Sequence, residues 1–338
     1  MKRKRPGVLI LHQAPPAAGG GKPAWSESDA GVMAEVRAVA DALDVLGCCR
    51  RTLGAARLED IPGILAEARE EVVFNLVESF AARPADANLV PAVAGAFGKA
   101  CTGNDTPCLA LALDKWRTKA VLGAAGLPCP CGVMIPPGGK VTISRLPAGP
   151  YIVKPAHSDA SEGIDAASVI EAAGPALARA VLRVHRELGQ PALIEQYIAG
   201  RELNVSVLER RGAVEMLPIA EIDFSAFPAG LLRIVDYAAK WLPASFAYQN
   251  TPHIIPARLT RRQAGAVRQL TLGAWRAIGC RGYARVDMRL SAAGRPLVLE
   301  VNPNPDIALD AGFAAALAAA RIPYEEFVET AIEDARAY

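Results

Sequence analysis

The sequence has no long hydrophobic run. Although 51% of its 338 residues are hydrophobic, no stretch approaches the roughly 20 consecutive apolar residues that a membrane-spanning helix requires. The apolar stretch near the start, Val8–Leu11, is also much shorter than the hydrophobic region of a secretory signal peptide. We therefore expect no membrane association and predict a cytoplasmic protein.

The chain also has no excess of charge of one sign and no cysteine framework. Its net charge is +2, so the composition gives no reason to expect a nucleic acid or another polyanion as a partner. The seven cysteines are odd in number, and Cys129-Pro-Cys131 lacks a second pair at the spacing of a zinc site. We expect reduced and mostly buried thiols.

A glycine-rich phosphate-binding loop of the common type is missing as well. Gly19-Gly-Gly-Lys22 invites that interpretation, but Pro23 stands where Ser or Thr is needed and the upstream glycine is absent. The segment from Gln13 to Trp25 is rich in Pro and Gly and predicts a long mobile loop. Whether this loop closes over a site is left open by the sequence.

Strands and a helix alternate in the first third of the chain. Gly7–Leu11 and Val72–Val77 are apolar runs typical of buried parallel strands. Between them, Ser26–Asp29 has the character of a capping box before a helix that Gly47 ends. This alternation predicts a small α/β domain over residues 1–105.

The most informative segments lie near the C-terminus. Arg285–Leu290 and Leu297–Asp306 each open as a strand and end in polar residues. Asp287, Glu300 and Asn302 are hard oxygen donors, and the last two lie on the same side of one strand. Two carboxylates and an amide suit Mg²⁺ that also carries phosphate oxygens. The alternative is a pair of solvated strand ends.

The central part of the chain carries a second candidate. We expect a helix over Leu111–Leu127 and short strands near Val141–Ile143 and Tyr151–Lys154. Lys154 ends its strand beside Ala156–Gly163, a loop of small and polar residues. An ammonium group next to such a loop suits a polyphosphate, although lysines at strand ends are common.

Further elements follow toward the C-terminus. Ala192–Leu208 predicts two strands joined by a turn at Gly200, with Glu195 and Glu202 on either side. The other predicted elements are a strand at Val214–Ile219, a loop around Asp236–Trp241, an amphipathic helix at Arg262–Ile278 and an alanine-rich helix at Ala311–Ala320.

Taken together, these segments resemble the ATP-grasp superfamily and, within it, the D-alanine–D-alanine ligases. The similarity runs from Thr102 to about Ala308, and its blocks follow the family order: TGND, LALDKWRTKAVLGAAGLP, YIVKPAHSDASEGI, LIEQYIAGRELNVSVL, DYAAKW, GYARVDMRL and LEVNPNPD. The resemblance implies an α/β protein with α+β lobes in the ATP-grasp fold. Its expected parts are an N-terminal Rossmann-like domain over 1–105, a small central lobe over 106–190 and a C-terminal lobe over 191–338.

The resemblance also implies roles for residues that match the family pattern. Lys240 matches the lysine on the γ-phosphate, and Arg285 matches the arginine that stabilises the acyl phosphate and the tetrahedral intermediate. The implied Mg²⁺ ligands, for two ions, are Asp287, Glu300 and Asn302. The implied ATP contacts are Lys115 and Lys154 on the α- and β-phosphates, Glu195, Gln196, Tyr197 and Ile198 at adenine, and Glu202 at the ribose.

The implied reaction is an ATP- and Mg²⁺-dependent ligation. A carboxylate attacks the γ-phosphate to give an acyl phosphate and ADP, and an amine then forms an amide or dipeptide. Such a site depends on positioning and charge stabilisation rather than on a protein nucleophile. The partners are small carboxylates and amines, amino acids above all, and a homodimer is expected by family analogy. The alternatives are a nucleotide-binding scaffold or regulatory protein without turnover and a pure interaction protein.

The residues that hold the first substrate depart from the family pattern. Those ligases fix the first D-alanine with an N-terminal Glu, a loop Ser and a Tyr. Here Glu27 is the nearest Glu, Ala160 stands at the loop position beside Ser161, and Trp241 replaces the Tyr. D-alanine–D-alanine ligation itself is therefore not the leading substrate assignment.

Asp306 stands where the family has a glycine. We hypothesise that its carboxylate, together with Asp310, favours a substrate with a positive group. The alternative is that Asp306 caps a helix over Ile307–Ala320.

Overall fold

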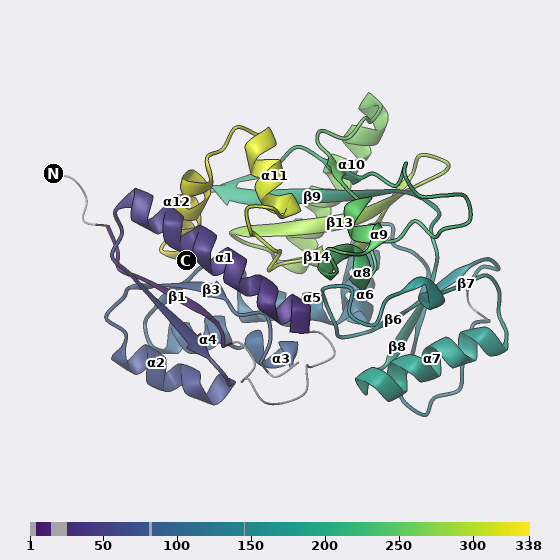
Figure 1. Ribbon diagram of the computed structural model, residues 1–338, viewed down its shortest axis with the longest axis horizontal. Coiled ribbons are helices and arrows are strands. Elements are labelled where there is room, and N and C mark those ends of the chain that lie inside the picture. The colour runs from purple at the N-terminus through teal and green to yellow at the C-terminus, as the bar shows by residue number, and fades with distance from the viewer. Residues whose placement is uncertain (1–4, 15–25, 81–82, 145) are drawn as a thin grey trace.

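Three β-sheets, each with its own helices, make up the molecule (Figure 1). The computed structural model describes residues 5–14, 26–80, 83–144 and 146–338, with the side chains of residues 26–30 left out. The glycine-rich stretch Gly19–Lys22 and the basic segment Lys2–Lys4 lie outside these ranges. Among the described residues, no helix has the length and apolar character needed to span a bilayer.

The N-terminal sheet is parallel and has the order β2-β1-β3-β4. Its strands are β1 (Val8–Gln13), β2 (Arg50–Ala55), β3 (Val72–Leu76) and β4 (Ala100–Cys101). Its helices are α1 (Ser26–Leu46), η1 (Leu58–Asp60), α2 (Ile61–Glu67), α3 (Pro84–Ala87) and α4 (Val90–Ala96). Every residue of β1 and β3 is buried, as predicted from their apolar runs. Gly47 ends α1 with a positive φ of 68°, which glycine adopts without strain.

The helix predicted over Leu111–Leu127 is two helices. They are α5 (Thr106–Leu113) and α6 (Lys115–Ala124), and Asp114 separates them in an extended conformation. The Asp114 carboxylate accepts a hydrogen bond from the backbone N–H of Arg117 at 3.0 Å and so caps α6. The helical spacing of apolar residues continues across Asp114, so that spacing alone does not reveal that a new helix begins there.

The central sheet is antiparallel, in the order β5-β8-β6-β7, and α7 (Pro175–Leu188) packs on it (Figure 1). Its strands are β5 (Gly132–Ile135), β6 (Tyr151–Pro155), β7 (Val169–Ile170) and β8 (Ala192–Gln196), and η2 spans Ala166–Ser168. The strand predicted at Val141–Ile143 is wrong. Val141 and Ile143 pack against the central core without pairing, and β5 occupies the sheet position instead.

The C-terminal sheet has the order β12-β11-β9-β13-β14, with β10 paired to β9. Its strands are β9 (Gly200–Arg210), β10 (Ala213–Met216), β11 (Ala220–Ile222), β12 (His253–Ile254), β13 (Tyr283–Ser291) and β14 (Pro296–Asn302). Its helices are α8 (Tyr237–Trp241), α9 (Phe246–Gln249), α10 (Arg261–Ile278), α11 (Gly312–Ala319) and α12 (Tyr324–Ala335). The helix predicted at Arg262–Ile278 is confirmed as α10.

Two local predictions in this lobe are wrong. Asp236–Trp241 is not a loop, because the Asp236 carboxylate accepts the Ala239 N–H at 2.9 Å and caps α8. No helix starts at Ile307, since α11 begins at Gly312. Asp306 accepts the N–H of Ala308 at 2.8 Å within the loop before α11, so it stabilises a turn rather than a helix end.

The chain passes from the central sheet to the C-terminal sheet at Gly200. Its φ is 147°, and a Cβ there would lie 2.1 Å from the carbonyl oxygen of Leu290. Only glycine allows so close an approach. A division after residue 190 would cut β8 from its own sheet, and we therefore propose that the central lobe extends to this turn.

The cores show how the three parts are joined. One core cluster combines N-terminal residues such as Phe74 with C-terminal residues such as Phe313 and Phe327. The central lobe has a separate cluster around Val153 and Val184. The central sheet and α7 therefore have a core of their own, whereas α5 and α6 share a core cluster with the C-terminal sheet. The cavity opens beside the central sheet.

Candidate active site

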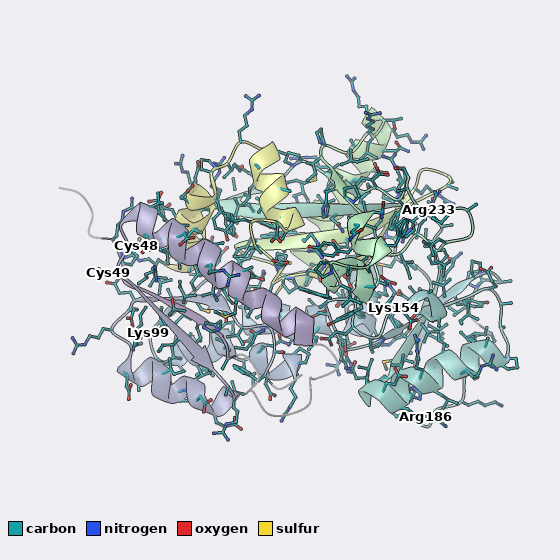
Figure 2. The ribbon with its side chains drawn as sticks, in the orientation of Figure 1. Cys48, Cys49, Lys99, Lys154, Arg186 and Arg233 are labelled. Carbon is teal, nitrogen blue, oxygen red and sulfur yellow. The ribbon has the colours of Figure 1, made fainter. Side chains whose placement is uncertain are left out.

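A single large cavity contains most of the predicted site residues. It has a volume of about 1070 Å³. Residues of the central and C-terminal sheets line it, and the N-terminal domain contributes residues of α1, of α3 and of the segment after β3. In Figure 2, Lys154 lies between the central lobe and the rest of the molecule, whereas Cys48 and Cys49 lie far away beside the N-terminal domain. All predicted site residues line the cavity except Lys115, which lies beside it, and Glu27, whose side chain lies outside the described residues.

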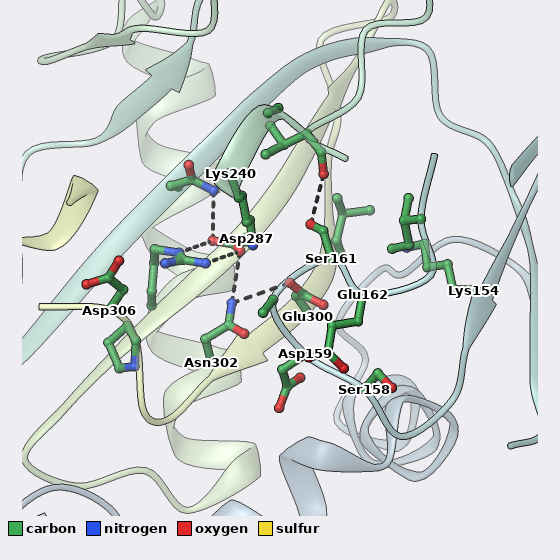
Figure 3. A pocket seen from close by; sticks show the side chains of 18 of the residues that line it. Lys154, Ser158, Asp159, Ser161, Glu162, Lys240, Asp287, Glu300, Asn302 and Asp306 are labelled. Carbon is green, nitrogen blue, oxygen red and sulfur yellow. Dashed lines mark hydrogen bonds and ion pairs between the residues drawn. The ribbon is translucent and has the colours of Figure 1, made fainter. Parts of the chain in front are cut away.

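Strands β13 and β14 bring the acidic residues together. Asp287 pairs with Glu300, and Arg285 pairs with Asn302, so the four side chains share one end of the two strands. The Asn302 amide donates to Asp287 at 2.9 Å and to Glu300 at 3.5 Å (Figure 3). The period of two along each strand places these donors on one face.

Arg285 is fixed to Asp287 by two hydrogen bonds. Its Nε and Nη2 donate to the two carboxylate oxygens at 2.7 and 2.9 Å. Burial alone would lower the pKa of Arg285, but Asp287 and Glu300 raise it above its ordinary value. Asn204 on β9 adds a hydrogen bond to Asp287 at 2.8 Å. The guanidinium is therefore a permanent positive charge on the cavity wall.

Lysines surround Glu300. Burial would raise the pKa of its carboxyl group, but Lys115, Lys240 and Lys154 lower that pKa to about 2. Lys115 lies 3.8 Å from Glu300 and 3.4 Å from Asp159, and it also donates to the carbonyl of Ser158. Glu300 is therefore ionised at any physiological pH and available as a cation ligand.

The donor set fits a hard divalent cation. Among the described residues, no three or more His, Cys, Asp and Glu side chains are arranged so that they could hold a metal ion by themselves. The donor set at this end of the strands is two carboxylates, Asp287 and Glu300, with Asn302. The amide nitrogen of Asn302 faces both carboxylates here, so its oxygen would have to turn toward a bound cation. Mg²⁺ is commonly held by one or two carboxylates, with substrate phosphates completing its oxygen shell.

At the other end of the cavity, Glu195 binds two lysines. Its carboxylate is completely buried, and Lys119 and Lys154 lie 2.7 and 2.9 Å from its two oxygens. Burial would raise the pKa of Glu195, but the two ammonium groups hold it below its ordinary value. The neighbouring residues Gln196, Tyr197 and Ile198 also line the cavity.

Glu202 follows the turn at Gly200 and pairs with Arg289 at 2.8 Å. Burial raises the pKa of Glu202, although Arg289 opposes the shift. The guanidinium of Arg289 also donates to the carbonyls of Gly200 and Arg233. Arg289 on β13 thus binds the turn at Gly200 and the segment at Arg233, next to the carboxylate of Glu202 on the cavity wall.

Trp241 links the three parts of the molecule. Its indole N–H donates to the carbonyl of Ala160 at 3.0 Å. A Cβ on Gly31 of α1 would lie only 2.7 Å from its ring, so helix and indole are in contact. Nearby, the Ser161 hydroxyl donates to the carbonyl of Val235 at 2.9 Å. Lys240, one residue before Trp241, points toward Asp287 (Figure 3) and is one of the cations that lower the pKa of Glu300.

Asp306 lies on the side of the cavity opposite to Lys154 (Figure 3), and its charge contributes to the raised pKa of Arg285. It is hydrogen bonded to Glu35, which is 4% exposed. Burial, Glu78 and Asp306 together raise the pKa of Glu35 well above its ordinary value. This end of the cavity is therefore acidic, and Glu78, Asp306 and Asp310 line it.

Several residues of the site were not predicted from the sequence. They are Glu35, Glu78, Lys119, Asn204 and Arg289. Arg289 had a usable signal, because it continues the period-two series of Arg285 and Asp287 along β13. The others come from elements far apart in the chain, and no spacing connects them to the site.

Comparisons with known proteins agree with this geometry. Residues 142–333 match the family model described as "D-ala D-ala ligase C-terminus". The D-alanine–D-alanine ligase of Actinobacillus pleuropneumoniae serotype 5b is 32% identical over 235 residues, which are 69% of this chain and 71% of that protein. The corresponding ligase of Xylella fastidiosa is 34% identical over 266 residues, covering 75% and 79%.

Two further relatives complete the comparison. The uncharacterized protein y4sG of Sinorhizobium fredii is 32% identical over 257 residues, covering 76% of this chain and 72% of that protein. The crystal structure of the D-alanine–D-alanine ligase of Bacillus anthracis complexed with ATP superposes with a TM-score of 0.76 at 18% identity, covering 98% of both chains. The predicted ATP-grasp fold is thereby confirmed.

Proposed function

The chain belongs to the D-alanine–D-alanine ligase family and is an ATP-dependent ligase; we propose that it joins a small carboxylate to an amine through an acyl phosphate. The observation that carries this proposal is the convergence of Arg285, Asp287, Glu300 and Asn302 at one end of β13 and β14, facing the lysines across the cavity. A nucleotide-binding scaffold has no need for this charged set and is not favoured.

The site supports the proposed reaction by charge and position. The carboxylate oxygen of the first substrate attacks the γ-phosphorus of ATP, and ADP leaves. The amine nitrogen of the second substrate then attacks the acyl carbon, phosphate leaves, and the amide forms. Lys240 is proposed to hold the γ-phosphate, and Arg285 to stabilise the negative charge that develops on the phosphate and the carbonyl oxygen.

The remaining residues are proposed to hold ATP and metal. Lys115 and Lys154 contact the α- and β-phosphates, and Glu202 the ribose hydroxyls. Glu195, Gln196, Tyr197 and Ile198 form the adenine site. Asp287, Glu300 and Asn302 would hold two Mg²⁺ ions, which neutralise phosphate charge when bound.

The acidic residues at one end of the cavity are proposed to select the charge of the second substrate. The described cations that line the cavity are Lys154, Lys240, Arg285 and Arg289. Of these, Arg285 interacts electrostatically with Asp306. Arg285 is already paired with Asp287. We propose that Asp306 favours an amine substrate with an additional positive group over one with a free carboxylate, because like charges in a shared site repel. Trp241 and Ser161 are proposed to contact the first substrate.

Phosphate release tests the proposed function. Purified protein with ATP and Mg²⁺ is assayed against D- and L-amino acids and diamines, singly and in pairs, with Glu300→Ala as the blank. We expect release that requires two substrates, and Asp306→Asn should raise KM for a cationic amine substrate at unchanged ATP affinity. If the protein binds ATP but no substrate causes phosphate release, the ligase proposal is wrong. Unchanged kinetic constants in Asp306→Asn defeat the role of Asp306 alone.

A further inference from the structure

Glu195 has one more positive neighbour than its charge requires. The carboxylate is fully buried, and the ammonium groups of Lys119 and Lys154 lie 2.7 and 2.9 Å from its two oxygens. One lysine would balance the charge, because a buried ion is tolerated once it is paired. The surplus lysine therefore calls for a separate explanation.

The two lysines differ in what surrounds them. Lys154 lines the cavity at the end of β6, whereas Lys119 on α6 is not among the described residues that line it. The ammonium group of Lys119 also donates to the carbonyl of Leu299 at 2.9 Å, and its side chain is 8% exposed. Lys119 is thus held from two sides behind Glu195, and Lys154 is bound only by Glu195 among the ion pairs of the described residues.

We propose that Lys119 is the permanent counter-ion of Glu195 and thereby releases Lys154 to bind ATP. The inference rests on the proposed role of Lys154 at the phosphates. When Lys154 turns toward a phosphate, Glu195 keeps one ammonium group and stays neutralised. Without Lys119, the same movement would leave a buried carboxylate unpaired, which is strongly unfavourable. Lys119 is therefore a positioning residue that never needs to touch the nucleotide.

The bond to Leu299 gives Lys119 a second consequence. Leu299 precedes Glu300 on β14, so the same ammonium group connects the adenine end of the cavity to the strand that carries a predicted metal ligand. Lys119→Arg keeps the charge, whereas Lys119→Met keeps only the aliphatic stem. These variants separate the effect of charge from that of packing.

A double-mutant cycle on ATP affinity tests the proposal. The variants are Lys119→Met, Glu195→Gln and the two combined, with the Kd for ATP measured by calorimetry without amino acids. We expect Lys119→Met to raise Kd by about 10- to 100-fold, because Lys154 then stays on Glu195. In the Glu195→Gln background, where no buried charge needs a partner, the same substitution should change Kd by less than about threefold. Lys119→Arg should stay near the wild type.

A matched control exists in the N-terminal domain. Lys99 donates to the carbonyls of Ala68 and Glu70 at 2.7 Å each and lies far from Lys154 (Figure 2). Lys99→Met should therefore lower the melting temperature without changing the Kd for ATP.

Three results would overturn the counter-ion role. They are equal effects of Lys119→Met with and without Glu195, an unchanged Kd in Lys119→Met, and a wild-type protein that binds no ATP. The ligase proposal fails separately, when ATP binds but no substrate pair releases phosphate.

Discussion

Arg285 is the cation that lies against Asp287, and its role can be tested by a single substitution. It is bound by both oxygens of Asp287 and lines the cavity. If it stabilises charge in the transition state, Arg285→Met should lower kcat by on the order of 10²–10³, as losing one such donor does in other enzymes. The measurement is substrate-dependent phosphate release at saturating ATP.

Arg281→Met is the control for this substitution. Arg281 precedes β13, donates to the carbonyl of Gly103 at 3.1 Å and lies over the ring of Tyr338, away from the described cavity wall. Its loss should affect stability and leave kcat within about twofold. An Arg285→Met enzyme with the wild-type kcat would show that the acyl-phosphate charge is stabilised elsewhere.

Glu35 makes stability depend on pH. Burial, Glu78 and Asp306 raise its pKa in the folded protein above that of the unfolded chain. The native state therefore binds the proton more tightly, and this contribution to stability is complete below the unfolded pKa and is lost as pH rises through the folded pKa. Glu35→Gln, which keeps an acceptor for the N–H of Ile307, removes the ionisable group. It should raise the melting temperature at pH 8 more than at pH 5.

A parallel pH dependence in the wild type and Glu35→Gln would contradict the raised pKa. The comparison is calorimetric, over pH 5 to 8, in buffers with small heats of ionisation. The neighbouring carboxylates Glu78 and Asp306 are present in both proteins, so the difference between the two curves reports Glu35 together with its coupling to them.

Residue type and local spacing were enough to predict part of the site. Asp287, Glu300 and Asn302 could be placed together because a strand alternates its faces and the two strands follow each other in the chain. Lys119 and Glu35 could not, because their charged partners lie on elements about 40 or more residues away, and nothing in the local pattern encodes those contacts.

At the level of single helices, two glycines make a matched pair. A Cβ added to Gly265 in α10 would meet nothing within 4 Å, whereas the same atom on Gly31 of α1 would meet Trp241 at 2.7 Å. Gly265→Ala should stabilise the protein by about 0.5–1 kcal/mol through helix propensity alone. Gly31→Ala should gain less and should raise KM for the first substrate, because the indole must move.

Denaturant unfolding and steady-state kinetics measure the two effects side by side. The prediction for Gly31→Ala requires Trp241 to contact the first substrate. If both variants have the same KM, Trp241 does not contact that substrate. Equal gains in stability for both variants would show that the indole moves aside at no cost.

The predictions of whole elements succeeded where burial dominates. Strands β1, β3 and β6 and helix α10 follow from apolar runs or helical spacing. They failed where one polar side chain overrides the pattern, as Asp114 does between α5 and α6 and Asp236 does before α8. The strand predicted at Val141–Ile143 is wrong for another reason. These side chains pack against the central core, but their backbone pairs with no strand of the described residues.

For the molecule as a whole, chain order is a poor guide to how the parts are joined. Resemblance to a family predicts lobes in sequence, yet the first and last thirds of the chain share one core. The aromatic rings of Tyr283, Phe313 and Phe327 pack together there, with centroids 5.2 to 5.8 Å apart. Contacts between the two ends of a chain are non-local, and the local sequence pattern does not predict them.

This shared core predicts which regions unfold together. Phe327 is fully buried between C-terminal aromatics and the N-terminal apolar residues, so Phe327→Ala should cost about 3–5 kcal/mol. Hydrogen exchange should then become faster in β1 and β3 as well as in β9 and β13, because one cooperative unit contains all four strands. Strands β6 and β8 should keep their protection.

The converse substitution lies in the core of the central sheet. Val153 is 1% exposed in the separate core of the central lobe, so Val153→Ala should speed exchange in β6 and β8 and leave β1, β3, β9 and β13 unchanged. Phe327→Leu gives a milder version of the first change if the alanine variant unfolds. Uniform acceleration in both variants would mean that the protein unfolds as one unit. The separate core of the central sheet and α7 is the structural reason to expect this sheet to unfold independently of the rest.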